Sequence, residues 1–250
     1  MPYREIIAAA YDSGVDEEYK RLEDSPSGVS EYQIFIDLFH KFIPDGKTVI
    51  DIGTGSGRYA EHLLKRNCKV GVVDLSAKSL KAFSDRLSEA SCNENIIFNK
   101  VSCATQLDWI ESGTADVILL MGPLYHLINE EHRILALNNC KRILKRRGLL
   151  FTVFISQGVN FGSITYTRFQ GFDVPQFRCH PAEAKKFMES NGFKTICMNN
   201  IGVNEAQTLK TILRSSCNFN SGEFGTCSNA YCLVNVGSSD QFFYVGSSDI

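Results

Sequence analysis

Three glycines at alternating positions follow a short apolar run near residue 50, and this segment constrains the fold more than any other. It reads Val49-Ile50-Asp51-Ile52-Gly53-Thr54-Gly55-Ser56-Gly57 and continues into an amphipathic stretch. Glycine permits a sharp turn and a close approach of the backbone to a ligand. Exposed amides at the start of a following helix favour a negatively charged group there. We therefore expect a strand, a turn and a helix that together bind a cofactor.

Short apolar runs alternate with amphipathic stretches after this turn. Strands are predicted at 48–50, 70–73, 96–101, 117–120 and 149–155, and helices at 58–66, 76–90 and 130–146. The runs are almost continuously apolar, as expected when helices cover both faces of a parallel sheet. Two more strands are expected at 193–198 and 231–236, the last one antiparallel at the sheet edge, and a further helix is expected at 205–215. Gly148 is expected to end the helix at 130–146 in a turn, and the repeated Val-Gly-Ser-Ser-Asp segments at 236–240 and 245–249 are interpreted as turns. The sequence thus predicts a doubly wound, mostly parallel, seven-stranded α/β sheet.

The chain divides into four expected parts around this sheet. They are an N-terminal helical cap, a cofactor-binding core, an insertion after the fifth strand that serves as a lid, and a C-terminal part of the same α/β domain: residues 1–46, 47–155, 156–180 and 181–250. The cap is predicted to be helical because Phe35, Leu38, Phe39 and Phe42 recur on one helical face. The insertion is aromatic and has no clear periodicity, and long insertions at this edge often carry function.

Composition narrows the class of protein and its partners. The net charge is −2 and no long basic run is present, so a nucleic-acid partner is not expected. No apolar stretch has the length of a membrane span, so no membrane partner is expected either. The nine cysteines are scattered without zinc-ligand spacing, which favours reduced thiols in a cytoplasmic protein and no metal site. The oligomeric state does not follow from the sequence.

The glycine segment resembles the first motif of class I S-adenosylmethionine-dependent methyltransferases, in the form Asp51-x-Gly53-x-Gly55-x-Gly57. The resemblance implies a Rossmann-like methyltransferase fold, with the glycine backbone along the methionine part of the cofactor and Asp51 near its amino group. The dinucleotide fingerprint G-x-G-x-x-G would need its third glycine at Arg58 or at Ala60. Alanine is tolerated there, so a dinucleotide-dependent reductase remains an alternative.

Further cofactor residues are expected at the ends of the next strands. Asp74 ends the second predicted strand, where an acid accepts hydrogen bonds from both ribose hydroxyls. After the third strand the family often has an acid that contacts adenine, and here Cys103 replaces it. The residues that the resemblance implies for S-adenosylmethionine are Asp51, Gly53, Thr54, Gly55, Gly57, Arg58, Asp74, Leu75, Cys103, Ala104, Met121 and Gly122.

The loop after the fourth strand, Gly122-Pro-Leu-Tyr-His-Leu127, resembles a bacterial subgroup of small-molecule methyltransferases. His126 is the candidate base, because imidazole titrates near neutral pH. Its alternative interpretation is a structural histidine bonded to a loop carbonyl. Tyr125 is expected to stack on the substrate or point its hydroxyl toward it, and Tyr11 to close the site from the cap. His180 is expected to cap a helix.

These features predict an enzyme that transfers a methyl group from S-adenosylmethionine to an oxygen or nitrogen atom of a small molecule. Two alternatives are a methyltransferase acting on RNA or protein, and a non-catalytic protein that only binds the cofactor. Transfer of another group from the same sulfonium also stays open, because the motifs describe the cofactor and not the acceptor.

Overall fold

The computed structural model describes residues 2–90, 93–156, 162–201 and 241–248. The strands are β1 Thr48–Ile52, β2 Lys69–Asp74, β3 Ile96–Val101, β4 Ala115–Leu120, β5 Leu144–Ser156, β6 Ser163–Phe169, β7 Phe172–Cys179, β8 Phe193–Ile201 and β9 Gln241–Ser248. The helices are α1 Pro2–Ser13, α2 Val15–Asp24, α3 Pro26–Phe42, α4 Arg58–Leu64, α5 Ala77–Ala90, the 3₁₀ turn Asn93–Asn95, α6 Pro123–His126, α7 Glu130–Ile143 and α8 Pro181–Ser190.

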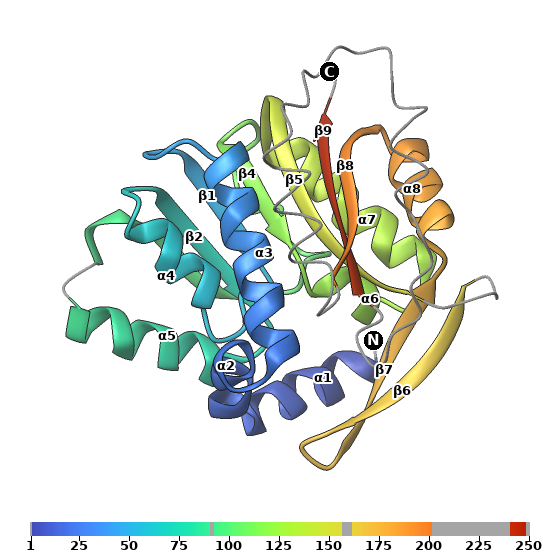
Figure 1. Cartoon of the computed structure of the whole chain (residues 1–250), viewed down its shortest axis with the longest axis horizontal. Helices are drawn as coiled ribbons and strands as arrows, with labels where there is room; N and C mark the ends of the chain where they lie inside the picture. The colour runs from blue at the N-terminus through green and yellow to red at the C-terminus, as the bar shows by residue number, and fades with distance from the viewer. Residues whose placement is uncertain (1, 91–92, 157–161, 202–240, 249–250) are drawn as a thin grey trace.

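The strands form one sheet whose core has the order β3-β2-β1-β4-β5-β9-β8 (Figure 1). The first five of these strands are parallel, and β9 is antiparallel to both β5 and β8. This core confirms the predicted mostly parallel seven-stranded sheet of the Rossmann-like methyltransferase fold, with an N-terminal helical cap and an insertion after β5. The insertion adds β6 and β7 to the same sheet.

Both faces of the sheet are buried, which explains the continuous apolar runs in the sequence. Val49, Val117 and Phe151 pack toward α3, α4 and α5, whereas their neighbours Ile50 and Ile118 pack toward α7. Successive side chains of a strand point to opposite faces, so a strand covered on both faces needs apolar residues throughout.

The last strand differs from the prediction. The expected strand at 231–236 and the expected helix at 205–215 lie outside the described residues. The described antiparallel strand is β9, and it lies between β5 and β8 instead of at the sheet edge. Val245 to Ser248, interpreted from the sequence as part of a turn, belong to this strand.

The link from α7 to β5 also differs from the prediction. The helix ends at Ile143, three residues before the expected Arg146, and Leu144 already pairs with β4. Gly148 was expected to make the turn, yet the left-handed residue is Arg147, with φ of 62°. A side chain on Gly148 would approach the Lys145 carbonyl oxygen to 2.9 Å, so this glycine is required by close packing.

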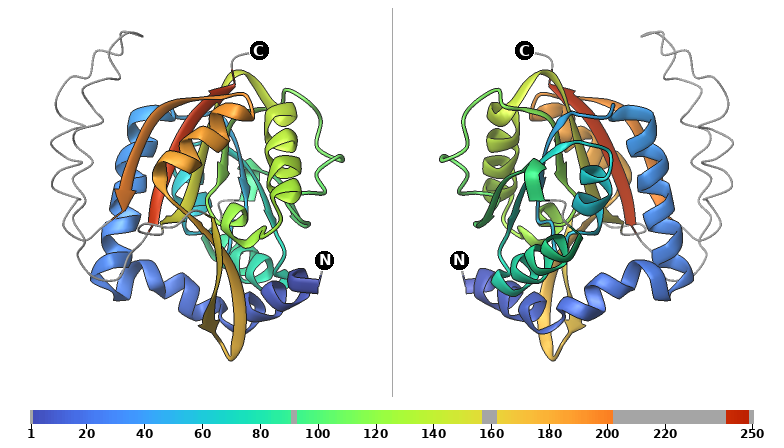
Figure 2. Two further views of the ribbon diagram at one scale, coloured as in Figure 1. Left: turned by 90° about the vertical axis from the view of Figure 1, so that its right-hand side faces the viewer. Right: turned by 90° about the vertical axis from the view of Figure 1, so that its left-hand side faces the viewer.

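The insertion forms a hairpin of β6 and β7 that extends away from the sheet beside α1 (Figure 2). Its strands show no simple alternation of buried and exposed residues, which is why the sequence gives no clear strand periodicity there. Only the end of β7 joins the sheet, where Arg178 and Cys179 pair with the end of β5. Among the described residues, no helix is long and apolar enough to cross a membrane.

Candidate active site

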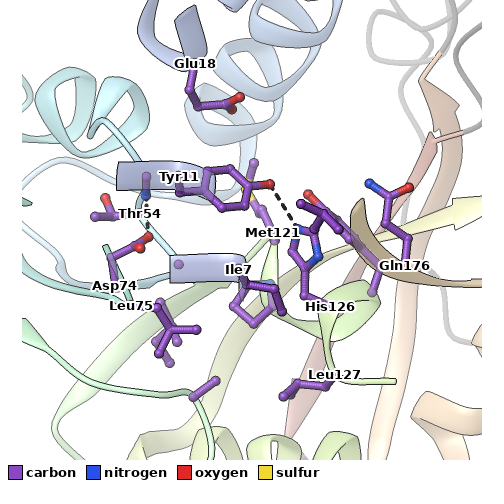
Figure 3. Close-up of a pocket in the computed structure, with 18 of the residues that line it drawn as sticks. Ile7, Tyr11, Glu18, Thr54, Asp74, Leu75, Met121, His126, Leu127 and Gln176 are labelled. Atoms are coloured by element: carbon purple, nitrogen blue, oxygen red, sulfur yellow. Dashed lines mark hydrogen bonds between the residues drawn. The ribbon is translucent and has the colours of Figure 1, made fainter. Parts of the chain in front are cut away.

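A cavity of about 460 Å³ lies at the carboxyl ends of the parallel strands, between the sheet, the cap helices and the β6–β7 hairpin (Figure 3). Open α/β sheets bind ligands at this edge. The turns after β1, β2, β3 and β4 form its floor, and α1 and α2 cover it. With the exception of Gly57, every residue that the sequence analysis assigned to the cofactor or to catalysis lines this cavity.

The three glycines of the turn all have positive φ angles, of 77°, 55° and 87°, but they serve different purposes. A Cβ atom on Gly53 would lie 2.6 Å from Pro123, and one on Gly57 would overlap the ring of Phe83. A Cβ atom on Gly55 would point into open space, 4.0 Å from Glu18 Cγ. Gly55 therefore faces the cavity, whereas Gly57 permits close packing of the turn on α5.

Two buried carboxylates flank this turn. Asp51 Oδ2 accepts a hydrogen bond from the Thr54 hydroxyl at 2.8 Å. Asp74 accepts the Gly55 amide at 2.7 Å with Oδ2 and the Ser76 amide at 2.8 Å with Oδ1. Burial raises the pKa of Asp51 to about 7, although the Thr54 hydrogen bond opposes this rise. Burial also raises the pKa of Asp74. Both carboxylates are therefore disfavoured in their ionised form by the loss of water around them.

The turn after β3 provides a small, apolar part of the wall. Cys103 is buried and accepts a hydrogen bond from the Thr105 hydroxyl at 3.2 Å. The Ala104 carbonyl accepts the Asn139 amide at 3.0 Å, which fixes the turn against α7. Leu75 lines the cavity next to it. The adenine contact that the resemblance implies for this turn stays a prediction.

Arg58 lines the cavity, but its guanidinium group is held by the cap. It pairs with Glu23 at 2.5 Å and lies 4.6 Å from the ring centre of Tyr19. Both partners belong to α2, so Arg58 ties the helix after the glycine turn to the cap. This contact supports the turn, and the cofactor contact expected for Arg58 stays a prediction.

Three charged residues of the cap were not predicted to be in the site. Arg21 donates to Glu18 Oε1 at 3.0 Å and to both oxygens of Glu31 at 2.7 and 3.1 Å. All three line the cavity, and Glu18 points down toward the glycine turn (Figure 3). Burial raises the pKa of Glu18, although Arg21 opposes the rise. The sequence signal was weak, because charges at helical spacing usually mark a solvated face.

The other end of the cavity holds Tyr11 and His126. The Tyr11 hydroxyl lies 2.9 Å from His126 Nε2, and His126 Nδ1 lies 3.2 Å from the Pro175 carbonyl oxygen (Figure 3). Tyr125 lies beside them, with its ring centre 4.6 Å from that of His126. Burial lowers the pKa of His126 to about 4, so the imidazole is neutral. His126 therefore bonds a backbone carbonyl, of strand β7 and not of a loop as expected, and it still faces the cavity.

Arg133 supports the loop that carries His126. Its guanidinium group donates to the Leu127 and Ile128 carbonyls at 2.7 and 2.9 Å and lies 3.7 Å from the ring centre of Phe177 in β7. The residue is buried, and burial lowers its pKa. His180, by contrast, caps α8 by accepting the Ala182 amide at 3.2 Å, which confirms the prediction of a helix cap.

Comparison with known proteins agrees with this geometry. Residues 49–148 match the family model described as "Methyltransferase domain", and this match includes the glycine turn and the strands that surround it. A ubiquinone biosynthesis O-methyltransferase from Coxiella burnetii is 26% identical over 167 residues, which cover 62% of this chain and 67% of that protein.

Solved structures share the fold at low sequence identity. The 1,6-didemethyltoxoflavin N1-methyltransferase of Burkholderia thailandensis, with bound 1,6-didemethyltoxoflavin and S-adenosylhomocysteine, has a TM-score of 0.69 and 13% identity, covering 100% of this chain and 90% of that chain. The cyclase SpnF has a TM-score of 0.62 and 13% identity, covering 88% of this chain and 81% of that chain. Since one of these proteins is a cyclase, the likeness shows the fold alone.

The matched domain, the fold and the cavity together indicate an S-adenosylmethionine-dependent methyltransferase. S-adenosylmethionine is the cofactor of this enzyme.

Proposed function

We propose that this enzyme transfers a methyl group from S-adenosylmethionine to an oxygen or nitrogen atom of a small-molecule acceptor. One observation carries the proposal: a single cavity holds the glycine turn and Asp74 at one end and the Tyr11–His126 pair at the other. A cavity covered by cap helices and a hairpin fits a small molecule better than RNA or a protein chain. The relatives named for ubiquinone biosynthesis and for didemethyltoxoflavin support a small acceptor of this kind.

The cofactor fits the polar end of the cavity. Each oxygen of Asp74 accepts one backbone amide and keeps a lone pair, which suits the two ribose hydroxyls. The space in front of Gly55 admits a ligand along the backbone. Asp51 and Glu18 are suited to the ammonium group. Arg21 donates three hydrogen bonds and a guanidinium has five N–H groups, so it can also meet the carboxylate.

The full set that we assign to S-adenosylmethionine includes the floor of the cavity as well. It consists of Asp51, Gly53, Thr54, Gly55, Asp74, Leu75, Cys103, Ala104, Met121 and Gly122, with Glu18 and Arg21 from the cap. Gly57 and Arg58 support the turn through packing. The bound cofactor supplies an electrophilic methyl group.

The chain's own residues position the acceptor and exclude water. We assign the acceptor to the space beside Tyr11, Tyr125 and His126, with His126 accepting a proton. In this proposal residues 1–46 form a cap over the core at 47–155, the segment 156–180 is a lid, and 181–250 complete the domain. The likeness of the loop at 122–127 to small-molecule methyltransferases supports this assignment.

Calorimetric titration tests the cofactor site. Asp74→Ala should weaken S-adenosylmethionine binding about tenfold to a hundredfold, since unpaired buried groups cost roughly 1–3 kcal/mol. Gly55→Val should abolish binding by filling the cavity. Gly113→Val is the matched control, because Gly113 also has a positive φ, of 67°, and no atom within 4 Å of its Cβ position. Wild-type affinity in both site variants would contradict the assignment.

A methyl-transfer assay with small acceptors, RNA and protein separates the remaining acceptor classes. Methylation of RNA or protein, with every small acceptor left unmethylated, would contradict the proposal.

A further inference from the structure

Three hydrogen-bonding groups from separate parts of the chain form a line at the acceptor end of the cavity. Tyr11 comes from α1, His126 from α6 and the Pro175 carbonyl from β7. The distances are 2.9 Å from Tyr11 Oη to His126 Nε2 and 3.2 Å from His126 Nδ1 to Pro175 O (Figure 3). Tyr11 and His126 line the cavity, so the line begins where an acceptor would bind.

The direction of each hydrogen bond follows from the groups themselves. A carbonyl oxygen only accepts, so His126 Nδ1 carries the proton and donates it to Pro175 O. A neutral imidazole has one N–H, so Nε2 must accept, and Tyr11 must donate to it. The low pKa of His126, about 4 because of burial, agrees with a neutral ring. Tyr11 has then used its only proton, and its oxygen offers lone pairs to the cavity.

We propose that Tyr11 and His126 form a proton relay whose oxygen end receives the proton of a hydroxyaromatic acceptor, a proposal that rests on the function proposed above. As the acceptor oxygen bonds to the methyl carbon, the carbon–sulfur bond breaks and its electron pair stays on sulfur. The acceptor proton passes to Tyr11 Oη, and the Tyr11 proton passes to His126 Nε2. The imidazolium later releases its proton to water.

The charge balance of this step explains why a deeply buried histidine can accept the proton. One positive charge is lost from sulfur and one appears on the imidazole ring, so the total charge within the cavity does not change. The acidic groups that face Tyr11 are Glu18 and Asp74, with Arg21 as the opposing cation and Tyr125 as a neutral neighbour. The surroundings of His126 disfavour the imidazolium, so we infer that it is short-lived and that the loss of charge from sulfur accompanies its formation.

The lining of this end favours an aromatic acceptor. Aromatic and apolar side chains make up much of the wall around the pair: Tyr3, Ile7, Leu127, Ile128, Phe169 and Val174. Asn129, Thr167 and Gln176 add polar groups to the same cavity. A phenol can place its ring against the apolar side chains, is neutral at pH 7 and can donate its hydroxyl proton to Tyr11.

Nuclear magnetic resonance of the cofactor-free protein tests the direction of the relay. In protein labelled with ¹⁵N-histidine, the His126 signals are assigned as those that disappear in His126→Gln. Their chemical shifts should report a neutral ring with its proton on Nδ1 throughout the neutral pH range. Tyr11→Phe should shift the Nε2 signal, whereas Tyr166→Phe, at a tyrosine that is 58% exposed on the hairpin, should not. A proton on Nε2, or an imidazolium at neutral pH, would overturn the relay without affecting cofactor binding.

A methyl-transfer assay tests the acceptor class in enzyme shown by calorimetry to bind S-adenosylmethionine. The uncharged probes are catechol, 2-naphthol and 8-hydroxyquinoline, and the charged probes are benzoate and benzylamine. We expect transfer to at least one uncharged probe and to neither charged one. Tyr11→Phe should lower kcat at least a hundredfold, the usual scale of general base catalysis, with KM for the cofactor unchanged. Transfer to charged probes alone, or to none, would refute the acceptor class, while loss of cofactor binding would refute the proposed function.

Discussion

Replacing Asp51 with asparagine should stabilise the cofactor-free protein, although Asp51 lies in the most constrained segment of the chain. Burial raises the pKa of this carboxyl from 3.8 to about 7. A tenfold change in an acid's ionisation constant corresponds to about 1.4 kcal/mol, so keeping Asp51 ionised above pH 7 costs roughly 4 kcal/mol at most. Asparagine keeps an oxygen that can accept the Thr54 hydroxyl, which lies 2.8 Å from Asp51 Oδ2.

The sign of the pH dependence follows from the same raised pKa. Below about pH 4, Asp51 is protonated in both the folded and the unfolded chain, and ionisation costs nothing. As the pH rises toward 7, the unfolded chain releases this proton first, so the wild-type protein loses stability relative to Asp51→Asn. Any fixed cost of burying the new amide group is independent of pH and cancels from this comparison.

Urea unfolding at about pH 5 and about pH 8 measures the effect through the change in the free energy of unfolding. The gap between Asp51→Asn and wild type should grow by about 2 kcal/mol in favour of the variant between these pH values. Asp85→Asn is the control, because the Asp85 side chain is 59% exposed on α5 and pairs with Lys81 at the surface. A gap that stays constant, or that shrinks as the pH rises, would refute the reasoning.

Three further predictions address the cofactor, the loop that carries His126 and the left-handed residue near the start of β5. S-adenosylmethionine carries a sulfonium charge that S-adenosylhomocysteine lacks, and ionised Asp51 favours that charge. The ratio of the S-adenosylhomocysteine Kd to the S-adenosylmethionine Kd should therefore rise with pH up to about 7, and a ratio that calorimetry finds constant with pH would contradict this. Arg133→Met should raise the KM of the acceptor about tenfold, or roughly 1.4 kcal/mol, because its loop carbonyls lose their donor. Arg142→Met removes two similar bonds to carbonyls outside the cavity, at 2.5 and 2.7 Å, and should reduce only stability; equal KM values in both variants would count against the Arg133 role. Arg147→Gly should raise the free energy of unfolding by up to about 1 kcal/mol, because φ of 62° strains a side chain, and a loss of stability in urea would disprove it.

The parts predicted well from the sequence are those in which a local pattern has one structural solution. Runs such as Val117 to Leu120 are apolar at every position, and only a strand buried on both faces needs that pattern. Gly53 and Gly55 have positive φ angles at the end of such a strand, so the turn and its ligand edge follow. Asp74 was predicted for the same reason, since it ends the neighbouring strand.

The parts that the sequence did not reveal depend on contacts between distant segments. Gly57 looks like its neighbours in the motif, but its packing on Phe83 is visible only once α5 is in place. Glu18 and Arg21 have the spacing of an ordinary surface pair, and they enter the site because α3 brings Glu31 to the same point. The hairpin was similarly hidden, because its strands have no single buried face.

The buried charges of the cavity connect stability with function. Asp51, Asp74 and Glu18 all have raised pKa values because burial disfavours their ionised forms. Glu18 is partly compensated by Arg21, whereas Asp51 and Asp74 have no cationic partner among the described residues, and such carboxylates are costly to bury. A ligand that brings a sulfonium and an ammonium group lowers that cost, so the buried acids favour binding of the cofactor. After methyl transfer the sulfonium charge is lost and the carboxylates are again less well compensated. We therefore expect the same acids that destabilise the empty cavity to favour the donor over its product.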